Sequence, residues 1–494
     1  MPLLIKNGLV LPSAHSEPRT VDILVDGALI SNIGRDLYAP EGVRVIDAEG
    51  HLVIPGLINA HTHGRENLLK GLIDNRPLEP WLLQLAALTD ERSPEDQYVS
   101  VALGAVEMLK HGVTAAYELF TNIPTITPEA VAAVLGAYRD VGLRAVVAPC
   151  VADIPYHRTI PGLVERLEPS LINALDGLFP ARVGSDLLDV VEQSVADWKI
   201  GTGEDLVRLA LAPVIPERCT DAFLVACRDL AKKLNLPIHT HLLETKIQAV
   251  ERFRRDGCST PTVLDRLGLL TETSSLAHAI WVTPGDIELI GQRGCGVVHN
   301  PVSNLKLGSG IMPMRKMMDQ HIHLAIGTDG CASADHQNIF EAIRLAAYIH
   351  RPSEPDYDAW PVAAEVLEAA WEGGAYALGF GGRLGRIEPG YLADIVLLDL
   401  DSEGLTPLNN AANQLVLCEN GRAVRTVIVN GRIVLDQGEP TMIEAKSIRA
   451  RARESARRLS RNIQQSQIVS RVEPALKAAR SSAIATPSNF IGLP

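Results

Sequence analysis

The sequence predicts an α/β protein: a closed (β/α)8 TIM-like barrel with a small β-sandwich domain formed from both chain ends. Short β-branched segments precede residue 56, eight alternations of strand and helix follow, and short strands return near residue 394. Such alternation favours parallel strands, and eight of them favour a closed barrel. We expect the β-sandwich at 1–55 and 381–440, the barrel at 56–380, and a basic helical tail at 441–494.

Turn pairs such as Asn7-Gly8 and Asp26-Gly27 separate the first strands. We expect this part of the chain to form an antiparallel unit with strands at Leu3–Val10, Val21–Val25, Ala28–Ile33 and Val45–Ile54. The returning strands are expected at Asp394–Asp399, Leu415–Cys418, Val424–Val429 and Arg432–Leu435. The simplest assembly pairs the two sets in one small domain.

The barrel strands are apolar runs that each end near polar residues. They are expected at Leu57–His63, Val113–Leu119, Arg144–Ala152, Val207–Val214, Pro237–Leu242, Ser275–Trp281, Gly296–Asn300 and His323–Thr328. Helical periodicity between them is clearest at Pro94–Leu109, Pro128–Val141, Asp221–Leu234 and Thr283–Arg293. The link from Asp153 to Gly203 exceeds the usual few residues, so we expect it to hold a helix or two over one face.

Composition restricts the class of protein. The 494 residues are 46% hydrophobic, which suits a large buried core, and the net charge of −13 disfavours nucleic acid and anionic membranes as partners. Seven cysteines without a Cys-x-x-Cys pair, no apolar run of membrane-spanning length and no signal-peptide pattern predict a cytoplasmic protein. The basic tail has an apolar stripe at helical spacing, so we expect a helix lying on the acidic barrel or on a second subunit of a homo-oligomer.

Histidines and acids gather at the ends of the predicted strands, where barrel enzymes carry their chemistry. His61 and His63 are two residues apart on one strand and therefore project from the same face. His241, with Glu244 three residues later, ends the fifth strand. Later strand ends carry His278, His299 and Asp329. Neutral imidazoles and a carboxylate suit zinc or iron, and a metal that keeps a water can support hydrolysis.

These stretches resemble the amidohydrolase superfamily, within it the branch of cytosine, guanine and S-adenosylhomocysteine deaminases and triazine hydrolases. The matching motifs are PGLINAHTHGRENLLKG, GVTAAYE, IHTHLLET, LAHAIWV, VVHNPVSNLKLGSGIMP, AIGTDG and GRIEPGYLADIVLLD. The resemblance implies a barrel with one divalent metal, zinc or iron, that hydrolyses a carbon–nitrogen bond of a small molecule. It assigns the metal to His61, His63, His241 and Asp329, and proton transfer to Glu244 and His278.

Some assignments have alternatives. His239 points the same way as His241 and could be the ligand instead, although only His241 has the His-x-x-Glu spacing. His299 could contact the substrate or merely hold its strand end. Glu118, at the end of the second strand, is expected to orient a ligand or a loop. The fourth strand lacks the lysine that bridges two metals in other members of the superfamily, which favours one metal.

Substrate identity is not carried over by the resemblance. Many S-adenosylhomocysteine deaminases place a glutamate directly before the loop tryptophan, whereas Pro80 precedes Trp81 here and Glu79 comes one step earlier. We expect Arg65, Trp81, His299 and His336 to contact a heteroaromatic amine, with a free base or compact ring preferred over S-adenosylhomocysteine. Release of chloride or an alkylamine, or cleavage of an amide or carbamate, is the alternative chemistry, and a non-catalytic scaffold is disfavoured because the ligand and acid sets are complete.

Overall fold

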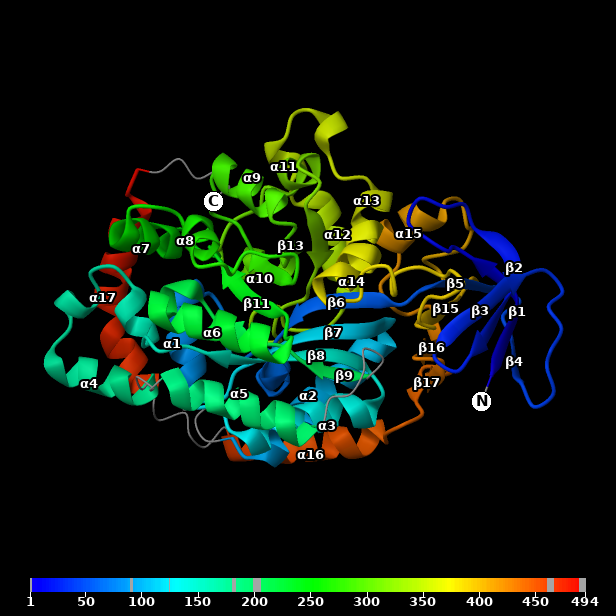
Figure 1. Ribbon diagram of the computed structural model, residues 1–494, viewed down its shortest axis with the longest axis horizontal. Coiled ribbons are helices and arrows are strands. Elements are labelled where there is room, and N and C mark those ends of the chain that lie inside the picture. The colour runs from blue at the N-terminus through cyan, green and yellow to red at the C-terminus, as the bar shows by residue number, and fades with distance from the viewer. Residues whose placement is uncertain are drawn as a thin grey trace.

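The computed structural model describes residues 2–88, 92–123, 125–179, 184–198, 206–459 and 466–487. Figure 1 shows the strands of the two chain ends, blue and orange, together at one end of the molecule. The parallel strands of the barrel occupy the middle, with helices around them. The last helix, in red, lies at the opposite end from the blue and orange strands. The chain therefore begins in the terminal sheet, builds the barrel, returns to that sheet and finally runs back along the barrel.

The barrel strands are parallel and follow one another around the ring in chain order. They are β6 (Leu57–Thr62), β7 (Val113–Phe120), β8 (Arg144–Val151), β9 (Val207–Leu209) with β10 (Ala212–Pro213), β11 (Ile238–Leu242), β12 (Ser274–His278), β13 (Gly296–His299) and β14 (His323–Ile326). The expected strands are thus confirmed to within a few residues. The fourth is split into two pieces around Ala210 and Leu211.

Two sets of backbone hydrogen bonds join the half-barrels that contain β6–β10 and β11–β14. Leu211 receives a bond from His239 N and donates to Pro237 O, both at 3.0 Å, and His241 N donates to Val214 O at 3.1 Å. At the other seam, Asp329 N donates to His61 O at 2.9 Å. The second seam places Asp329, which follows the last strand, beside His61 on the first strand. Two of the candidate metal ligands are thereby brought together.

The helices that cover the barrel begin at recognisable caps. Ser93 forms a capping box with Asp96 at the start of one helix, and Thr283 forms another with Asp286. The helices of the barrel region are α1 (Leu78–Leu88), α2 (Pro94–Lys110), α3 (Pro128–Val141), α4 (Pro169–Leu178), α5 (Gly184–Trp198), α6 (Asp221–Leu234), α7 (Lys246–Asp256), α8 (Thr260–Arg266), α9 (Pro284–Gln292), α10 (Pro301–Lys306), α11 (Met314–Asp319), α12 (Ile339–Tyr348), α13 (Ala363–Glu368) and α14 (Gly374–Ala377). The long link after β8 holds α4 and α5, as expected.

Strands from both chain ends form one nine-stranded sheet in the order β18-β17-β16-β15-β5-β1-β2-β3, with β4 beside β1. Its strands are β1 (Leu3–Val10), β2 (Arg19–Asp26), β3 (Leu29–Gly34), β4 (Arg44–Asp47), β5 (His51–Pro55), β15 (Ile395–Asp399), β16 (Val424–Val429), β17 (Arg432–Asp436) and β18 (Glu439–Pro440). The expected joining of the ends occurs where β15 pairs with β5. A sandwich of two packed sheets, and the domain limits given above, stay predictions.

Three expectations about the terminal sheet are wrong. The single strand expected at Val45–Ile54 is two strands, β4 and β5. The N-terminal unit is not wholly antiparallel, because β1 pairs with β4 and β5 in parallel. Leu415–Cys418 is not a strand, since α15 (Ala411–Leu417) occupies that stretch. The side chain of Asn410 caps this helix by accepting a bond from Asn413 N, and Leu415 and Val416 are buried on its inner face. A short apolar run does not distinguish a buried strand from a buried helical turn.

A buried ion pair ties the barrel to the terminal sheet. Arg144, at the start of β8, donates through Nε and Nη2 to Asp394 at 3.1 and 2.9 Å. Asp394 directly precedes β15 and also accepts from the backbone of Asn430 at 2.8 Å. Arg144 is fully buried, so each partner needs the other to offset the loss of water. This contact fixes the sheet against the bottom of the barrel.

The basic tail lies on the barrel of its own chain. α16 (Ala445–Leu459) packs on α2, where Arg451 pairs with Glu95 and Arg458 with Asp96, both at 2.6 Å. α17 (Ser466–Ile484) packs against α1, α4 and α7 (Figure 1). Residues 460–465 and 488–494 of the predicted tail lie outside the described residues. Within the described ranges, no helix is both long enough and apolar enough to span a membrane.

Candidate metal centre and active site

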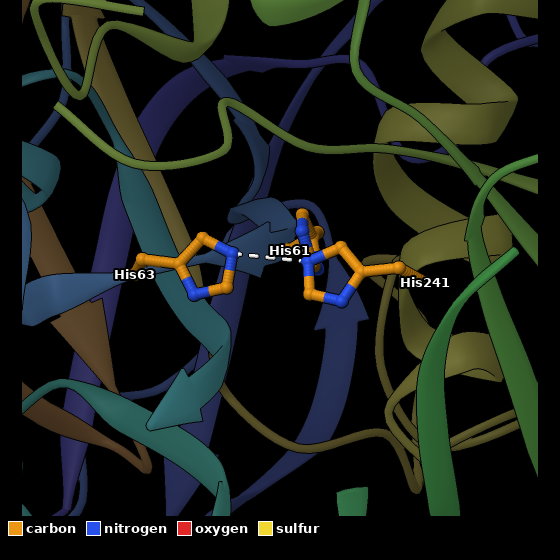
Figure 2. Close-up of side chains that lie close together, drawn as sticks. All are labelled: His61, His63 and His241. Atoms are coloured by element: carbon orange, nitrogen blue, oxygen red, sulfur yellow. Dashed lines mark hydrogen bonds between the residues drawn. The ribbon is translucent and has the colours of Figure 1, made fainter. Parts of the chain in front are cut away.

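Three histidines and one aspartate converge at the upper ends of the barrel strands. His61 and His63 come from β6, His241 from β11, and Asp329 follows β14. Figure 2 shows His63 and His241 facing each other, with His61 between and behind them. The His63 and His241 Nε2 atoms lie 3.2 Å apart, and Asp329 Oδ1 lies 3.6 Å from His61 Nε2 and 3.3 Å from His63 Nε2. All four side chains are buried.

The other ring nitrogen of each histidine is already engaged. His63 Nδ1 lies 2.8 Å from Leu119 O, and His241 Nδ1 lies 2.6 Å from Val214 O. Because a carbonyl oxygen can only accept, both Nδ1 atoms carry the proton and both Nε2 atoms present a lone pair. Two lone pairs directed at each other across 3.2 Å repel unless a cation lies between them.

His239 explains why His61 presents the same nitrogen. His61 Nδ1 lies 2.9 Å from His239 Nε2, and His239 Nδ1 lies 3.1 Å from Ser275 O. The carbonyl fixes the His239 proton on Nδ1, so its Nε2 accepts from His61 and leaves the His61 Nε2 lone pair free. His239, which the sequence left open as a possible ligand, therefore orients a ligand from behind.

The donor set fits one divalent metal ion. The ligand atoms of His61, His63 and His241 all lie within 4.8 Å of one another, and so do those of His61, His278 and Asp329. His61 Nε2 is buried without a hydrogen-bond partner. Burial lowers the pKa of His61 and of His241 well below the usual value, so both imidazoles are neutral and able to bind a metal. Three imidazoles with one carboxylate oxygen suit zinc or iron.

Two further side chains face this centre as the resemblance implied. Glu244 Oε2 lies 3.9 Å from His278 Nε2, which in turn lies 4.0 Å from Asp329 Oδ2. His278 Nδ1 contacts Asn304 Oδ1 at 2.8 Å, so the His278 ring is held with Nε2 toward the site. Burial, followed by the charge of Asp329, raises the pKa of Glu244 well above its usual value. A carboxyl group that keeps its proton near neutral pH can serve as a general acid.

Glu118 on β7 was expected to orient a ligand or a loop, and it contacts the loop that follows His63. Both of its carboxylate oxygens accept from Gly64 N at 2.8 Å, and its Oε2 also accepts from the Tyr138 hydroxyl at 2.7 Å. Gly64 follows His63 directly. Glu118 therefore fixes the turn that aims the second histidine of the first strand.

An open cavity leads to the candidate metal ligands. Its floor includes His63, His241 and Asp329, with Glu244 and His278 beside them. The remaining wall is mostly apolar and comes from α1, the loop after β7, the link after β8, the loop after β10 and the end of α10. It includes Leu78, Trp81, Leu82, Leu85, Ile123, Ile126, Leu178, Phe179, Val214, Ile215 and Leu307. A largely apolar space with polar groups at one end suits a ring system with an attached group.

The expected substrate contacts divide into two pairs. Arg65 and Trp81 line the cavity, where Trp81 Nε1 donates to Ala332 O at 3.1 Å and so presents its ring as wall. His299 is fully buried beside His350 and His336 pairs with Glu341 at 2.5 Å, and neither belongs to the cavity wall. The structure does not support the predicted contact of His299 and His336 with substrate, because both side chains contact residues outside the cavity.

Two residues of the cavity wall, Glu66 and Arg218, were not identified from the sequence. Glu66 lies three residues after His63, and burial raises its pKa to about 7. Arg218 follows the fourth strand in the 3-10 turn η4 (Pro216–Arg218). Both stand close behind a strand end, which is the one signal that could have singled them out.

Glu79 turns away from the cavity and toward the C-terminal helix. Its Oε1 accepts from Thr245 Oγ1 at 2.9 Å, and its Oε2 lies 3.4 Å from Arg480 Nε on α17. Glu79 is 1% exposed, so Arg480 supplies its only cation among the described residues. Since Thr245 follows Glu244, Glu79 links the tail to the segment next to the candidate acid.

We expect Arg480→Gln to lower the free energy of unfolding by about 1–3 kcal/mol, because a buried carboxylate loses its charged partner. It should also lower kcat by shifting the Thr245 segment. Thermal unfolding and steady-state kinetics measure the two effects. Glu79→Gln in the same chain should restore part of both, and Arg471→Gln, an exposed arginine on the same helix, is the matched control. Full stability and kcat in Arg480→Gln would contradict the expectation.

Comparison with known proteins agrees with this geometry. The profile of the Amidohydrolase family matches residues 52–434. The chain belongs to the amidohydrolase family. A 5-methylthioadenosine/S-adenosylhomocysteine deaminase of Pyrococcus furiosus is 32% identical over 90% of this chain and 98% of that protein. A 5'-deoxyadenosine deaminase of Methanosarcina barkeri is 29% identical over 92% of this chain and 98% of that protein.

Solved structures of amidohydrolases have the same fold. A zinc-bound adenosine deaminase from Xanthomonas campestris superposes with a TM-score of 0.81 at 30% identity, covering 93% of this chain and 98% of that one. The atrazine chlorohydrolase TrzN of Arthrobacter aurescens, complexed with zinc, gives 0.82 at 25% identity, covering 92% and 100%. The barrel and the metal-dependent hydrolase expected from the sequence are confirmed at the level of the family.

Proposed function

We propose that this amidohydrolase removes the amino group of a nitrogen heterocycle, using one metal ion bound by His61, His63, His241 and Asp329. The observation that carries the proposal is the placement of Glu244 and His278 beside that ligand set, inside a largely apolar cavity. Relatives of about 30% identity are named as deaminases of adenosine derivatives, which supports the same reaction class. Zinc is the proposed metal, because the solved adenosine deaminase relative holds it.

A metal held by these four residues would lower the pKa of a bound water to about 7. Asp329 directs Oδ1 toward the ligand imidazoles and Oδ2 toward His278, so Oδ2 can accept a proton from the attacking water. Ser303 Oγ donates to Oδ2 at 2.5 Å and holds the carboxylate in this orientation. The water oxygen then bonds to the ring carbon that carries the amino group.

Glu244 and His278 complete the reaction from the other side. Protonated Glu244 can deliver its proton to the ring nitrogen next to that carbon, which makes the carbon a better electrophile. His278 can stabilise the negative charge that develops on the incoming oxygen. When the carbon–nitrogen bond breaks, the leaving nitrogen takes the proton held by Asp329 and departs as ammonia. The hydroxyl proton returns to Glu244, and the ring keeps a carbonyl.

The identity of the ring remains a prediction. Glu79 is buried against Thr245 and Arg480, so α1 offers no carboxylate to a ribose at that position. A site without a substrate's expected hydrogen-bond partner discriminates against that substrate. This supports the expected preference for free bases and compact heteroaromatic amines over S-adenosylhomocysteine.

A screen of the metal-loaded protein tests the function. Adenosine derivatives, free purines, pterins, pyrimidines and amino-triazines are assayed for ammonia, with chloride and alkylamine release followed in parallel. We expect ammonia from at least one heterocyclic amine and a higher kcat/KM for a free base than for its nucleoside. Release of only chloride or alkylamine would contradict deamination, and a clear preference for nucleosides would contradict the predicted substrate class.

Two expectations from the sequence stay predictions. One is the cytoplasmic location, and the other is assembly into a homo-oligomer. Light scattering coupled to size-exclusion chromatography measures the second directly.

A further inference from the structure

A second guanidinium stands in the wall of the cavity. Arg218 in η4 lines the same cavity as Glu244 and Asp329, and it is partly exposed there. Its Nε donates to Ile154 O at 3.3 Å. No other side-chain hydrogen bond is formed by Arg218 within the described ranges, so Nη1 and Nη2 remain able to bind a group in the cavity.

The acids near Arg218 along the chain are engaged elsewhere. Glu217 accepts from Thr260 Oγ1 at 2.5 Å and pairs with buried Arg252. Asp153 accepts from Thr220 through both its carboxylate oxygens, at 2.9 and 2.7 Å. No carboxylate of the described residues lies within ion-pair distance of Arg218. A cation at a cavity wall without a counter-charge attracts an anion from outside.

Aromatic rings hold this cation in place. The Arg218 guanidinium lies 5.9 Å from the ring centre of Tyr156 and 5.8 Å from that of Phe179. Arginine keeps its charge under all ordinary conditions, and its stacking on rings limits its motion. A pre-oriented guanidinium loses little freedom when it binds a planar oxygen pair.

The neighbouring wall carries a second arginine, Arg65, which has Glu66 and Glu118 within electrostatic reach. Arg65 and Arg218 both lie within electrostatic reach of Cys150. Burial raises the pKa of the Cys150 thiol to about 12, so this group is neutral and no counter-ion. Thr121 and Asn122 offer polar contacts on the same wall. The region around Arg218 therefore combines a fixed cation with uncharged donors and acceptors.

We propose that Arg218 forms a subsite for a carboxylate carried by the substrate, away from the amino group that is removed. The inference rests on the proposed function and narrows its substrate class to heteroaromatic amines that bear a carboxylate. A carboxylate matches one guanidinium in shape and charge, with two parallel N–H···O bonds. A phosphate would bring a second negative charge into a wall that is mostly apolar.

Matched substrate pairs test the subsite. The pairs are 5'-deoxyadenosine with adenosine-5'-carboxylic acid, and pterin with pterin-6-carboxylic acid, and adenosine 5'-monophosphate is the phosphate arm. We expect the carboxylated member of a pair to have the higher kcat/KM by about 10- to 100-fold, as for a charged hydrogen-bonded pair. Arg218→Met should abolish this advantage and leave the neutral member within about threefold of wild type.

Two further variants control the result. Arg218→Lys keeps a point charge without the two-pronged geometry, so it should retain part of the advantage. Arg166→Met removes an exposed arginine of the link after β8 and should change neither member. Activity on the neutral member shows that each variant folds.

Four outcomes overturn the inference. Equal kcat/KM within every pair, or an advantage that survives in Arg218→Met, would remove the subsite while leaving deamination intact. A phosphate arm that exceeds the carboxylate arm and depends on Arg218 would overturn the choice of carboxylate. Ammonia from no member of any pair would overturn the proposed function and this inference with it.

Discussion

Replacing Glu244 with glutamine should leave the metal bound and reduce kcat by roughly 10²–10⁴-fold, the usual contribution of a positioned acid or base. The amide keeps the shape of the side chain and can still bond to Ser309, but it cannot deliver a proton. Glu244 is buried 3.9 Å from His278, where no water replaces the lost acid readily. Steady-state kinetics and metal analysis of the same preparation measure both parts of the prediction.

Glu251→Gln is the matched control for this variant. Glu251 lies on α7, seven residues later, and pairs with Arg254 at 2.9 Å outside the cavity wall. Its exchange should leave kcat unchanged. A Glu244→Gln protein with normal kcat and a raised KM would show that Glu244 binds substrate and transfers no proton.

Asp329→Ala should lose metal and activity together, because it removes one of four protein ligands. The expected fall in metal affinity exceeds the roughly 10–100-fold that loss of a backing hydrogen bond costs at metal sites. Asp329 is held by Ser303 and by Gly330 N, at 2.5 and 2.8 Å, so a neighbouring side chain does not readily take its place. Elemental analysis after dialysis and an activity assay give the two readouts.

His61→Ala should behave in the same way, and Asp335→Ala is the control. Asp335 follows Asp329 in the same loop but pairs with Lys306 at 2.5 Å. Its loss should leave the metal in place. An Asp329→Ala protein that is fully metallated and active would refute the ligand assignment.

The sequence predicted the barrel well because its signals are local and repeated. Strand β7 and helix α6 lie within a residue of their expected limits, since each combines an apolar pattern with a clear boundary. The strand expected at Leu415–Cys418 was wrong, because three apolar residues fit a helix as well and the Asn410 cap decides the matter. Parallel pairing of β1 with β4 and β5 depends on contacts that no local pattern encodes.

The candidate site likewise has features that the sequence predicts and features that only the folded chain shows. The candidate ligands His61, His63 and His241 stand at strand ends, where the barrel itself brings them together, so motif and spacing predict their proximity. The role of His239 required the distance to His61. The cation on Glu79 comes from Arg480, about four hundred residues later, and only the folded chain shows that the tail meets α1. Sequence position does not tell which side chains near a strand end line the cavity. Arg218 lines it and His299 does not.

The central claim is that one metal ion, held by the histidine–aspartate centre, supports deamination in the cavity. Titrating zinc into chelator-treated protein while following ammonia release from the best heterocyclic amine tests it most directly. We predict that activity is absent without metal, rises in proportion to bound zinc and reaches its plateau at one ion per chain. Undiminished ammonia release from metal-free protein, or a plateau only at two ions per chain, would contradict the account.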